Sequence, residues 1–157
     1  MTVDERLTAA GLADEFLAAV KRRDVDRLRE ILCSVHPDGA TMASHLDRPL
    51  EPDWAVRIET VRRFRPEDWS EAARILRRLD LPFLEVPSRS LDRARVHLAL
   101  VKLSGGDLSV LGRAGKDAMI DWRDILVAAG LANGDWRDVL ARQGFAVPAL
   151  PGGGKDA

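Results

Sequence analysis

Residues 90–103 read SLDRARVHLALVKL, and this stretch decides the fold class. Ser90 is a candidate N-cap, and the apolar residues that follow it form an almost continuous face. Because a helix that is apolar on most of its surface belongs in a protein interior, we expect this helix to be the central one. Gly105 and Gly106 come directly after it and predict where it ends.

Helical patterns continue on both sides of this segment. Apolar residues recur at helical spacing in residues 13–23, 24–35, 53–64 and 66–79, in a run that ends at Gly130, and in a last short helix from Asp135. A further short helix is predicted from Asp107 to Leu111. No segment alternates with the period of two that is typical of a half-buried strand. The sequence therefore predicts an all-α fold, a compact bundle of seven to nine short helices with no sheet.

Three stretches interrupt this pattern. Residues 40–52 carry at most one helical turn before two prolines. In residues 81–87, LPFLEVP, prolines near both ends oppose a helix, so we expect an extended segment with Phe83 tucked against the bundle. Residues 146–157 include PALPGGGKDA and are predicted to be a flexible tail. Residues 1–145 are predicted to form a single helical domain, with a subdivision near residues 36–53 left open.

The composition indicates a cytoplasmic globular protein. The chain has 157 residues, of which 46% are hydrophobic and 31% charged, with a formal net charge of −1. No apolar run is long enough for a membrane helix, and the acidic N-terminus lacks a signal-type segment. A single cysteine, Cys33, excludes an internal disulfide and suits a reducing compartment. The excess of arginine over lysine is typical of a bacterial genome rich in G and C.

Positive charge is concentrated in the middle of the chain. Residues 1–53 carry 7 basic and 11 acidic side chains, whereas residues 54–103 carry 11 basic and 7 acidic ones. The two regions could attract each other, or the middle could present a basic face to nucleic acid or to an acidic partner. Arginines at helix C-termini also complement the helix dipole. The candidate basic patch consists of Arg62, Arg63, Arg65, Arg74, Arg77 and Arg78.

Each of the four tryptophans follows an aspartate. The simpler interpretation is that the indole packs over a helix start while the aspartate caps the helix. The alternative is that some are exposed anchors for a partner, because tryptophan is enriched at the centres of protein interfaces. The candidate anchors are Trp54, Trp69 and Trp136.

The word Asp-Trp-Arg-Asp occurs twice, at residues 121–124 and 135–138. The first copy lies within an apolar stripe that begins at Ala118, so we expect Asp121 to be in the middle of a helix. The second follows Asn133-Gly134, so we expect Asp135 to be an N-cap. The repeat is therefore interpreted as two unrelated helix segments rather than a duplicated site.

The sequence assigns no catalytic, cofactor-binding or metal-binding residue. Cys33, His36 and His45 lack the second pair of ligands that a structural zinc site uses, and Cys33 is expected in the core. His97 lies within an apolar run and is interpreted as a buried, hydrogen-bonded histidine. The row Asp117, Asp121 and Asp124 is interpreted as a solvated helix face. The turn SGGD could receive an anion, although Asp107 would repel one.

Residues 96–131 resemble a small bacterial all-helical family of uncharacterised function. The resemblance rests on the apolar helix VHLALVKL, the Gly-Asp-Leu restart and the ending DWRDILVAAGL. It implies no catalytic residues. Separately, FLAAVKRRDVDRLREIL is similar to one ankyrin-type helical pair, but the TPLH-like signature and a second copy are missing, so that fold is not predicted.

These observations favour a noncatalytic protein-interaction or regulatory accessory module, whose partner is another protein or a second copy. One alternative is a nucleic-acid-associated protein that uses the arginine-rich middle, and another is an enzyme whose site is not legible in the sequence. An interaction module should expose an apolar, aromatic-containing patch on its helices. An enzyme should have a deep pocket with convergent polar groups.

Overall fold

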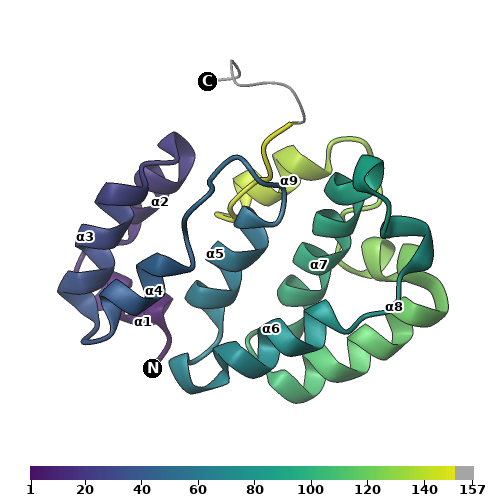
Figure 1. Cartoon of the computed structure of the whole chain (residues 1–157), viewed down its shortest axis with the longest axis horizontal. Helices are drawn as coiled ribbons and strands as arrows, with labels where there is room; N and C mark the ends of the chain where they lie inside the picture. Colours follow the sequence, from purple (N-terminus) through teal and green to yellow (C-terminus); the bar gives the residue numbers. More distant parts are fainter. Residues whose placement is uncertain (151–157) are drawn as a thin grey trace.

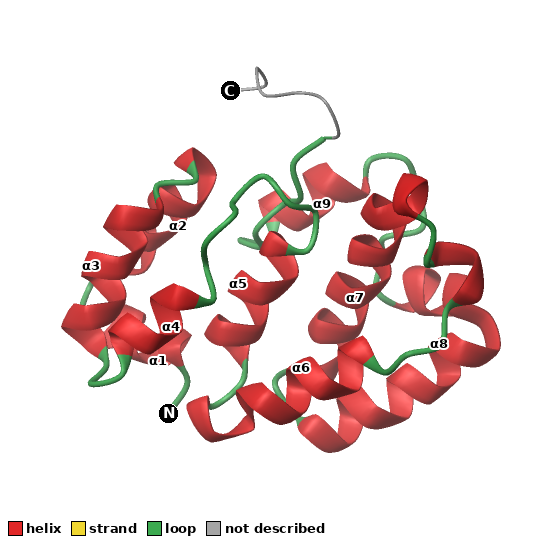
Figure 2. Ribbon diagram, viewed as in Figure 1, coloured by secondary structure: helices red, strands yellow, loops and turns green. Residues whose placement is uncertain are grey.

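The computed structural model describes residues 1–150 and confirms the all-α class. Within that range the chain forms nine α-helices and three 3₁₀ turns, and no strand (Figures 1 and 2). The α-helices are α1 (Val3–Ala9), α2 (Ala13–Arg22), α3 (Val25–Val35), α4 (Gly39–Ser44), α5 (Trp54–Arg63), α6 (Trp69–Arg77), α7 (Ser90–Ser104), α8 (Leu108–Ala128) and α9 (Trp136–Arg142). The 3₁₀ turns are η1 (Pro66–Asp68), η2 (Pro82–Leu84) and η3 (Pro87–Arg89).

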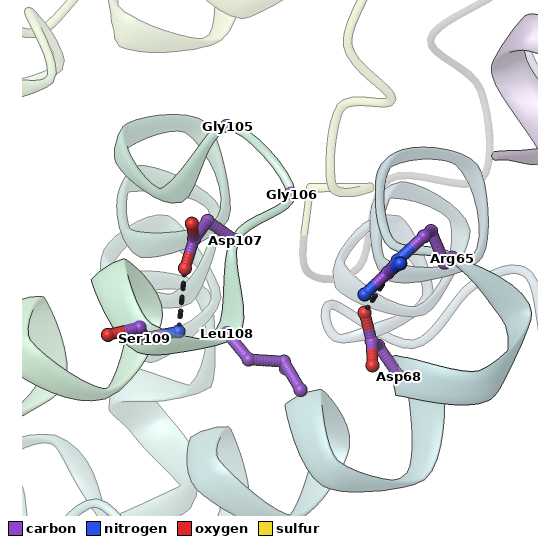
Figure 3. A pocket seen from close by; sticks show the side chains of 7 residues that line it. All are labelled: Arg65, Asp68, Gly105, Gly106, Asp107, Leu108 and Ser109. Atoms are coloured by element: carbon purple, nitrogen blue, oxygen red, sulfur yellow. Dashed lines mark hydrogen bonds and ion pairs between the residues drawn. The ribbon is translucent and has the colours of Figure 1, made fainter. Parts of the chain in front are cut away.

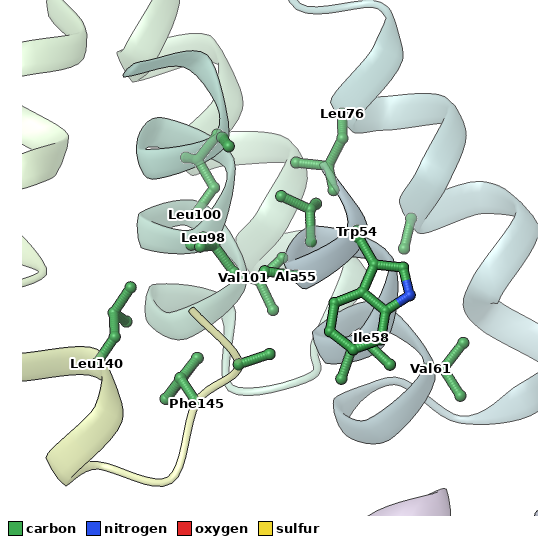
Figure 4. Packing of buried hydrophobic residues seen from close by; sticks show 14 of the residues in the cluster. Trp54, Ala55, Ile58, Val61, Leu76, Leu98, Leu100, Val101, Leu140 and Phe145 are labelled. Atoms are coloured by element: carbon green, nitrogen blue, oxygen red, sulfur yellow. The ribbon is translucent and has the colours of Figure 1, made fainter. Parts of the chain in front are cut away.

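Helix α7 lies at the centre, as predicted. It packs most extensively against α8 and also against α5 (Figure 1). Its C-terminal half is buried on nearly all sides, which explains why that part of the sequence has no polar face. Figure 4 shows its side chains in one cluster with those of α5, α6 and α9. Gly105 ends the helix in the left-handed region, at φ 57°.

The N-terminal helices α1 to α4 pack on one another, and α1 connects them to α5. The start of α4 lies so close to the end of α3 that a Cβ atom at Gly39 would be 2.4 Å from the carbonyl oxygen of Leu32. The buried hydrophobic residues form one continuous cluster that runs from Val3 to Ala146. The core therefore continues across residues 36–53, where the sequence left a subdivision open.

Helix α8 differs from the prediction of a short helix that ends at Leu111. It runs from Leu108 to Ala128 and bends at Asp121, where φ is −149° and ψ is 100°. The Asp121 carboxylate accepts a hydrogen bond from the Arg123 N–H at 3.0 Å and so begins the second half of the helix. Gly112 and Gly115 are accommodated within the first half.

The prediction for residues 81–87 is wrong in two respects. The segment forms η2 and the start of η3 rather than an extended segment, because each proline occupies the first position of a 3₁₀ turn. Leu81 and Leu84 are buried, whereas the Phe83 side chain is 76% exposed. The turn geometry therefore directs the leucines, and not the phenylalanine, into the core.

The C-terminal segment packs further along the chain than the predicted boundary at residue 146. Ala146 and Pro148 are buried although the backbone there is irregular. The Ala146 N–H donates to the Glu59 carboxylate at 2.8 Å, and Arg137 donates to the Pro148 carbonyl. The rest of the predicted flexible tail, residues 151–157, lies outside the described residues.

A buried polar cluster joins both ends of the described chain to α5. Glu59 is fully buried and accepts hydrogen bonds from Arg62, Arg63 and the Ala146 backbone. Arg62 also donates to the Asp4 carboxylate at 3.0 Å and to the Gly144 carbonyl at 2.8 Å. Burial lowers the pKa of the Arg62 guanidinium, but the Glu59 and Asp4 carboxylates outweigh this effect and raise it. The cluster therefore connects α1, α5 and the C-terminal segment.

Candidate interaction surface

The six arginines of the candidate basic patch do not form one surface. Arg62 and Arg63 belong to the Glu59 cluster, where Arg62 is 5% exposed and Arg63 stacks 3.7 Å from the centre of the Phe145 ring. Arg65 pairs with Asp68, and Arg74 with Glu71. Most of the positive charge on these four side chains is therefore neutralised locally.

Arg77 and Arg78 are the two members of the patch that form no ion pair within residues 1–150. Both are exposed near the C-terminal end of α6, where positive charge complements the helix dipole. The predicted attraction between the acidic N-terminal region and the basic middle is realised in the Asp4–Arg62 pair. The other pairs in the middle region are local in sequence, since most join residues three or four positions apart.

Two of the three candidate tryptophan anchors contribute to the core. Trp54 is 2% exposed, and its indole N–H donates to the Leu46 carbonyl at 2.9 Å. Trp136 is also buried and lies beneath the Arg95 guanidinium. Burial removes both from the surface, in agreement with the simpler interpretation. Trp69 is half-buried and donates to the Phe64 carbonyl.

The two most exposed large apolar side chains of residues 1–150, Ile120 and Phe83, lie elsewhere, on two segments that run side by side. A Cβ atom at Gly115 would be 2.9 Å from the Leu79 side chain, and Arg89 lies 6.0 Å from the centre of the Trp122 ring. These two contacts place Leu79 beside Gly115 and Arg89 beside Trp122, so that residues 79–89 run along residues 115–122. Figure 1 shows the α6–α7 connection beside α8. We call the exposed apolar residues between these contacts the apolar ridge: Phe83, Val86, Met119 and Ile120.

The apolar ridge has the composition of a contact surface. Ile120 is 85% exposed, and the half-buried Trp122 lies next to the ridge, with the guanidinium groups of Arg89 and Arg123 at 6.0 and 5.5 Å from the centre of its ring. Sequence reasoning missed it because Phe83 is expected to pack against the bundle. One residue in the sequence could have revealed the ridge: Ile120 is apolar but falls outside the apolar stripe of its helix.

A small hollow of about 360 Å³ lies at the turn between α7 and α8 (Figure 3). The Asp107 carboxylate accepts hydrogen bonds from the Ser109 and Val110 N–H groups, at 2.8 and 3.1 Å. Arg65 is paired with Asp68 on the opposite side. The helix start that could have received an anion is therefore occupied by the side chain of the protein itself, as the sequence suggested.

A larger groove of about 1100 Å³ lies between α4, α5, α6 and α7. It is lined by one face of α5 between Asp53 and Val61, one face of α6 between Trp69 and Arg77, and the first two turns of α7. All three histidines of the chain line it. Its floor is apolar and its rim carries charges of both signs.

His97 stands on the α7 wall of this groove rather than in the closed core. Burial, together with the positive charge of Arg93, lowers the pKa of its imidazole from 6.5 to about 4, against the opposing effect of Asp53. The ring is therefore neutral at pH 7. Cys33 is exposed and not buried as expected. Among residues 1–150, no three histidine, cysteine or acidic side chains are arranged to hold a metal ion.

Comparisons with known proteins give no match: no family model, curated protein or solved structure is similar to this chain. Within residues 1–150, no helix combines the length and the apolar character that crossing a membrane requires.

Proposed function

We propose that the protein is a noncatalytic interaction module that binds another protein through the apolar ridge. The observation that carries the proposal is the exposure of Phe83 and Ile120 on adjacent segments, next to Trp122 and Arg89. Large apolar side chains that gather on a surface mark contact sites, and tryptophan and arginine dominate the binding energy of many interfaces. This is the feature expected of an interaction module.

The backbone beneath the apolar ridge supports the proposal. Leu81 and Leu84 anchor the loop in the core, and two proline-led turns fix its path. Because the loop is already ordered, this protein would lose little conformational entropy when a partner binds there. Self-association through the same surface is an alternative that the experiment below distinguishes. We also propose that the protein is cytoplasmic, a compartment that suits the exposed free thiol of Cys33. Membership of the small bacterial all-helical family is a further part of the proposal.

The test is an affinity pull-down from lysate of the source organism, with quantitative mass spectrometry, before and after nuclease treatment. The variant is Phe83→Glu with Ile120→Glu, which places two charges on the apolar ridge. The matched control is Leu50→Glu, because Leu50 is 69% exposed but lies outside the ridge. We expect proteins that the wild type and the control retain and that the double variant loses, by at least about tenfold.

Identical sets of proteins on all three baits would contradict the proposal. If the retained proteins are lost after nuclease treatment, the result would support the nucleic-acid alternative instead. Size-exclusion chromatography with light scattering gives the oligomeric state. A dimer of the wild type that the double variant loses would replace the foreign partner with a second copy.

A further inference from the structure

We propose that the groove between α4, α5, α6 and α7 is a second binding site, which takes a small amphiphilic anion with an apolar body and a carboxylate-type head. This site is separate from the apolar ridge and does not depend on the proposed function. Three features of the groove support this proposal: its apolar floor, the arginines on its α6 and α7 walls, and its size.

The floor of the groove suits an apolar body. Met42, Val56 and Leu76 line it and belong to the buried core, and the indole of Trp69 lies beside them, half-buried. Small side chains at Ala73 and Ala94 leave room above these groups. Displacing water from such a floor contributes about 25 cal/mol for each Å² of apolar surface that is covered.

The α6 and α7 walls suit an anionic head. Arg77 and Arg93 line them, and neither forms an ion pair within residues 1–150. Arg57, the third arginine of the groove, is neutralised by Asp53 and Glu51. The acids Asp38 and Glu85 also line the groove, but Asp38 belongs to the α3–α4 side and Glu85 is an exposed residue of the α6–α7 connection.

His97 lies on the α7 wall of the groove, one helical turn after Arg93. The lowered pKa of its imidazole is explained mainly by burial and by the positive charge of Arg93. Burial is the larger cause, and the smaller effect of Arg93 shows that its positive charge acts on this part of the groove, where a bound anion would be favoured. Ser90 lies one turn before Arg93 on the same face and offers a hydroxyl to the same head group.

The size of the groove is consistent with a small molecule. Its volume of about 1100 Å³ lies just above the roughly 300–1000 Å³ typical of small-molecule sites. An amphiphile together with a few water molecules would fill it.

A matched pair of fluorescent probes tests the proposal. Anilinonaphthalene sulfonate has an aromatic body and a permanent negative charge, and phenylnaphthylamine has the same body without the charge. Both become fluorescent when they leave water. We expect the folded wild type to bind the sulfonate at least about tenfold more tightly than the neutral probe.

Variants separate the two parts of the site. Arg77→Gln with Arg93→Gln should weaken the sulfonate by about tenfold or more and leave the neutral probe unchanged. Ala73→Trp should fill the groove and weaken both probes. The controls are Arg113→Gln and Ala128→Trp, which change exposed positions of α8 outside the groove. Circular dichroism confirms that each variant is folded.

Three results would overturn the inference. The first is equal affinity of the wild type for the two probes. The second is undiminished binding by folded Ala73→Trp. The third is loss of the sulfonate in Phe83→Glu with Ile120→Glu, since that would place the probe on the apolar ridge.

Discussion

Glu59 is the residue whose surroundings depend most on distant parts of the chain. Its carboxylate is fully buried, and its partners come from α5 itself and from residue 146, while Arg62 extends the cluster to Asp4. In the sequence, Glu59 is one acid in the basic middle region and nothing marks it as buried. Its i,i+3 and i,i+4 spacing to Arg62 and Arg63 is equally typical of an exposed helix face. The cluster could therefore not be predicted.

Replacing Glu59 should be strongly destabilising. In Glu59→Ala, the Arg62 guanidinium keeps only one carboxylate in a buried site, and the Ala146 N–H loses its acceptor. We expect the free energy of unfolding to fall by about 3–5 kcal/mol, measured by urea denaturation. Glu71→Ala, which breaks an exposed pair with Arg74, is the control and should cost less than about 1 kcal/mol. A loss for Glu59→Ala as small as that of the control would contradict the assignment.

His97 should make the protein less stable in mild acid. The pKa of its imidazole is about 4 in the folded state, where Arg93 and Asp53 act on it, and near 6.5 when it is unfolded. Between these values the unfolded state binds the proton more readily, so stability is complete above pH 6.5 and decreases as the pH falls toward 4. We expect a loss of about 1–2 kcal/mol from pH 7 to pH 5 that is specific to this residue.

Urea denaturation of His97→Gln at the two pH values isolates that contribution, because other titrating groups are common to both proteins. The variant should lose less stability than the wild type between pH 7 and pH 5. An identical pH dependence in the two proteins would show that the imidazole titrates normally.

At the scale of elements, some helix starts and ends could be predicted from the sequence. The sequence predicts helices that begin at Asp24 and Asp107 and one that ends at Gly105; both carboxylates accept backbone N–H groups in the first turn, and Gly105 ends α7. The end predicted at Leu111 was wrong because the packing of α8 against α6 and α7 stabilises a helix through Gly112 and Gly115. Tertiary contacts of this kind outweigh local propensity, and a single sequence does not display them.

The two copies of Asp-Trp-Arg-Asp occupy the predicted positions, inside α8 and before α9, but the capping carboxylate belongs to the first copy and not to the second. Asp121 has the extended backbone of an N-cap, and its carboxylate caps the second half of α8. Asp135 precedes α9 with ψ at 12°, and its side chain forms no cap hydrogen bond. The bend at Asp121 has no proline or adjacent glycine to mark it, so the pattern favoured a continuous helix.

This difference between the two copies gives a direct prediction. Asp121→Ala should lower the free energy of unfolding by about 1 kcal/mol, since it removes the acceptor of the Arg123 N–H. Asp135→Ala should change the free energy of unfolding by less than about 0.5 kcal/mol, because Asp135 is exposed and its side chain makes no cap hydrogen bond that the substitution could remove. Thermal or urea unfolding of the two variants decides the matter. A greater loss for Asp135→Ala would restore the original interpretation.

At the scale of the molecule, fold class could be predicted and the surface could not. Helical periodicity and the apolar segment around Leu98 are local properties, and they determined the all-α architecture with α7 at its centre. Which residues remain exposed depends on how elements meet. Phe83 and Met119 have core-type side chains, and Arg62 has a surface-type one, yet their positions are reversed in the fold. The apolar ridge and the groove both arise from contacts between distant segments.

Site-specific photo-crosslinking in the source cells tests whether the apolar ridge contacts a partner protein. A photoreactive phenylalanine analogue would replace Phe83, Ile120 or the control Leu50 in turn. We expect a discrete crosslinked species of higher mass from positions 83 and 120 and none from position 50. Absence of crosslinks at both ridge positions, or the same species from all three, would contradict it.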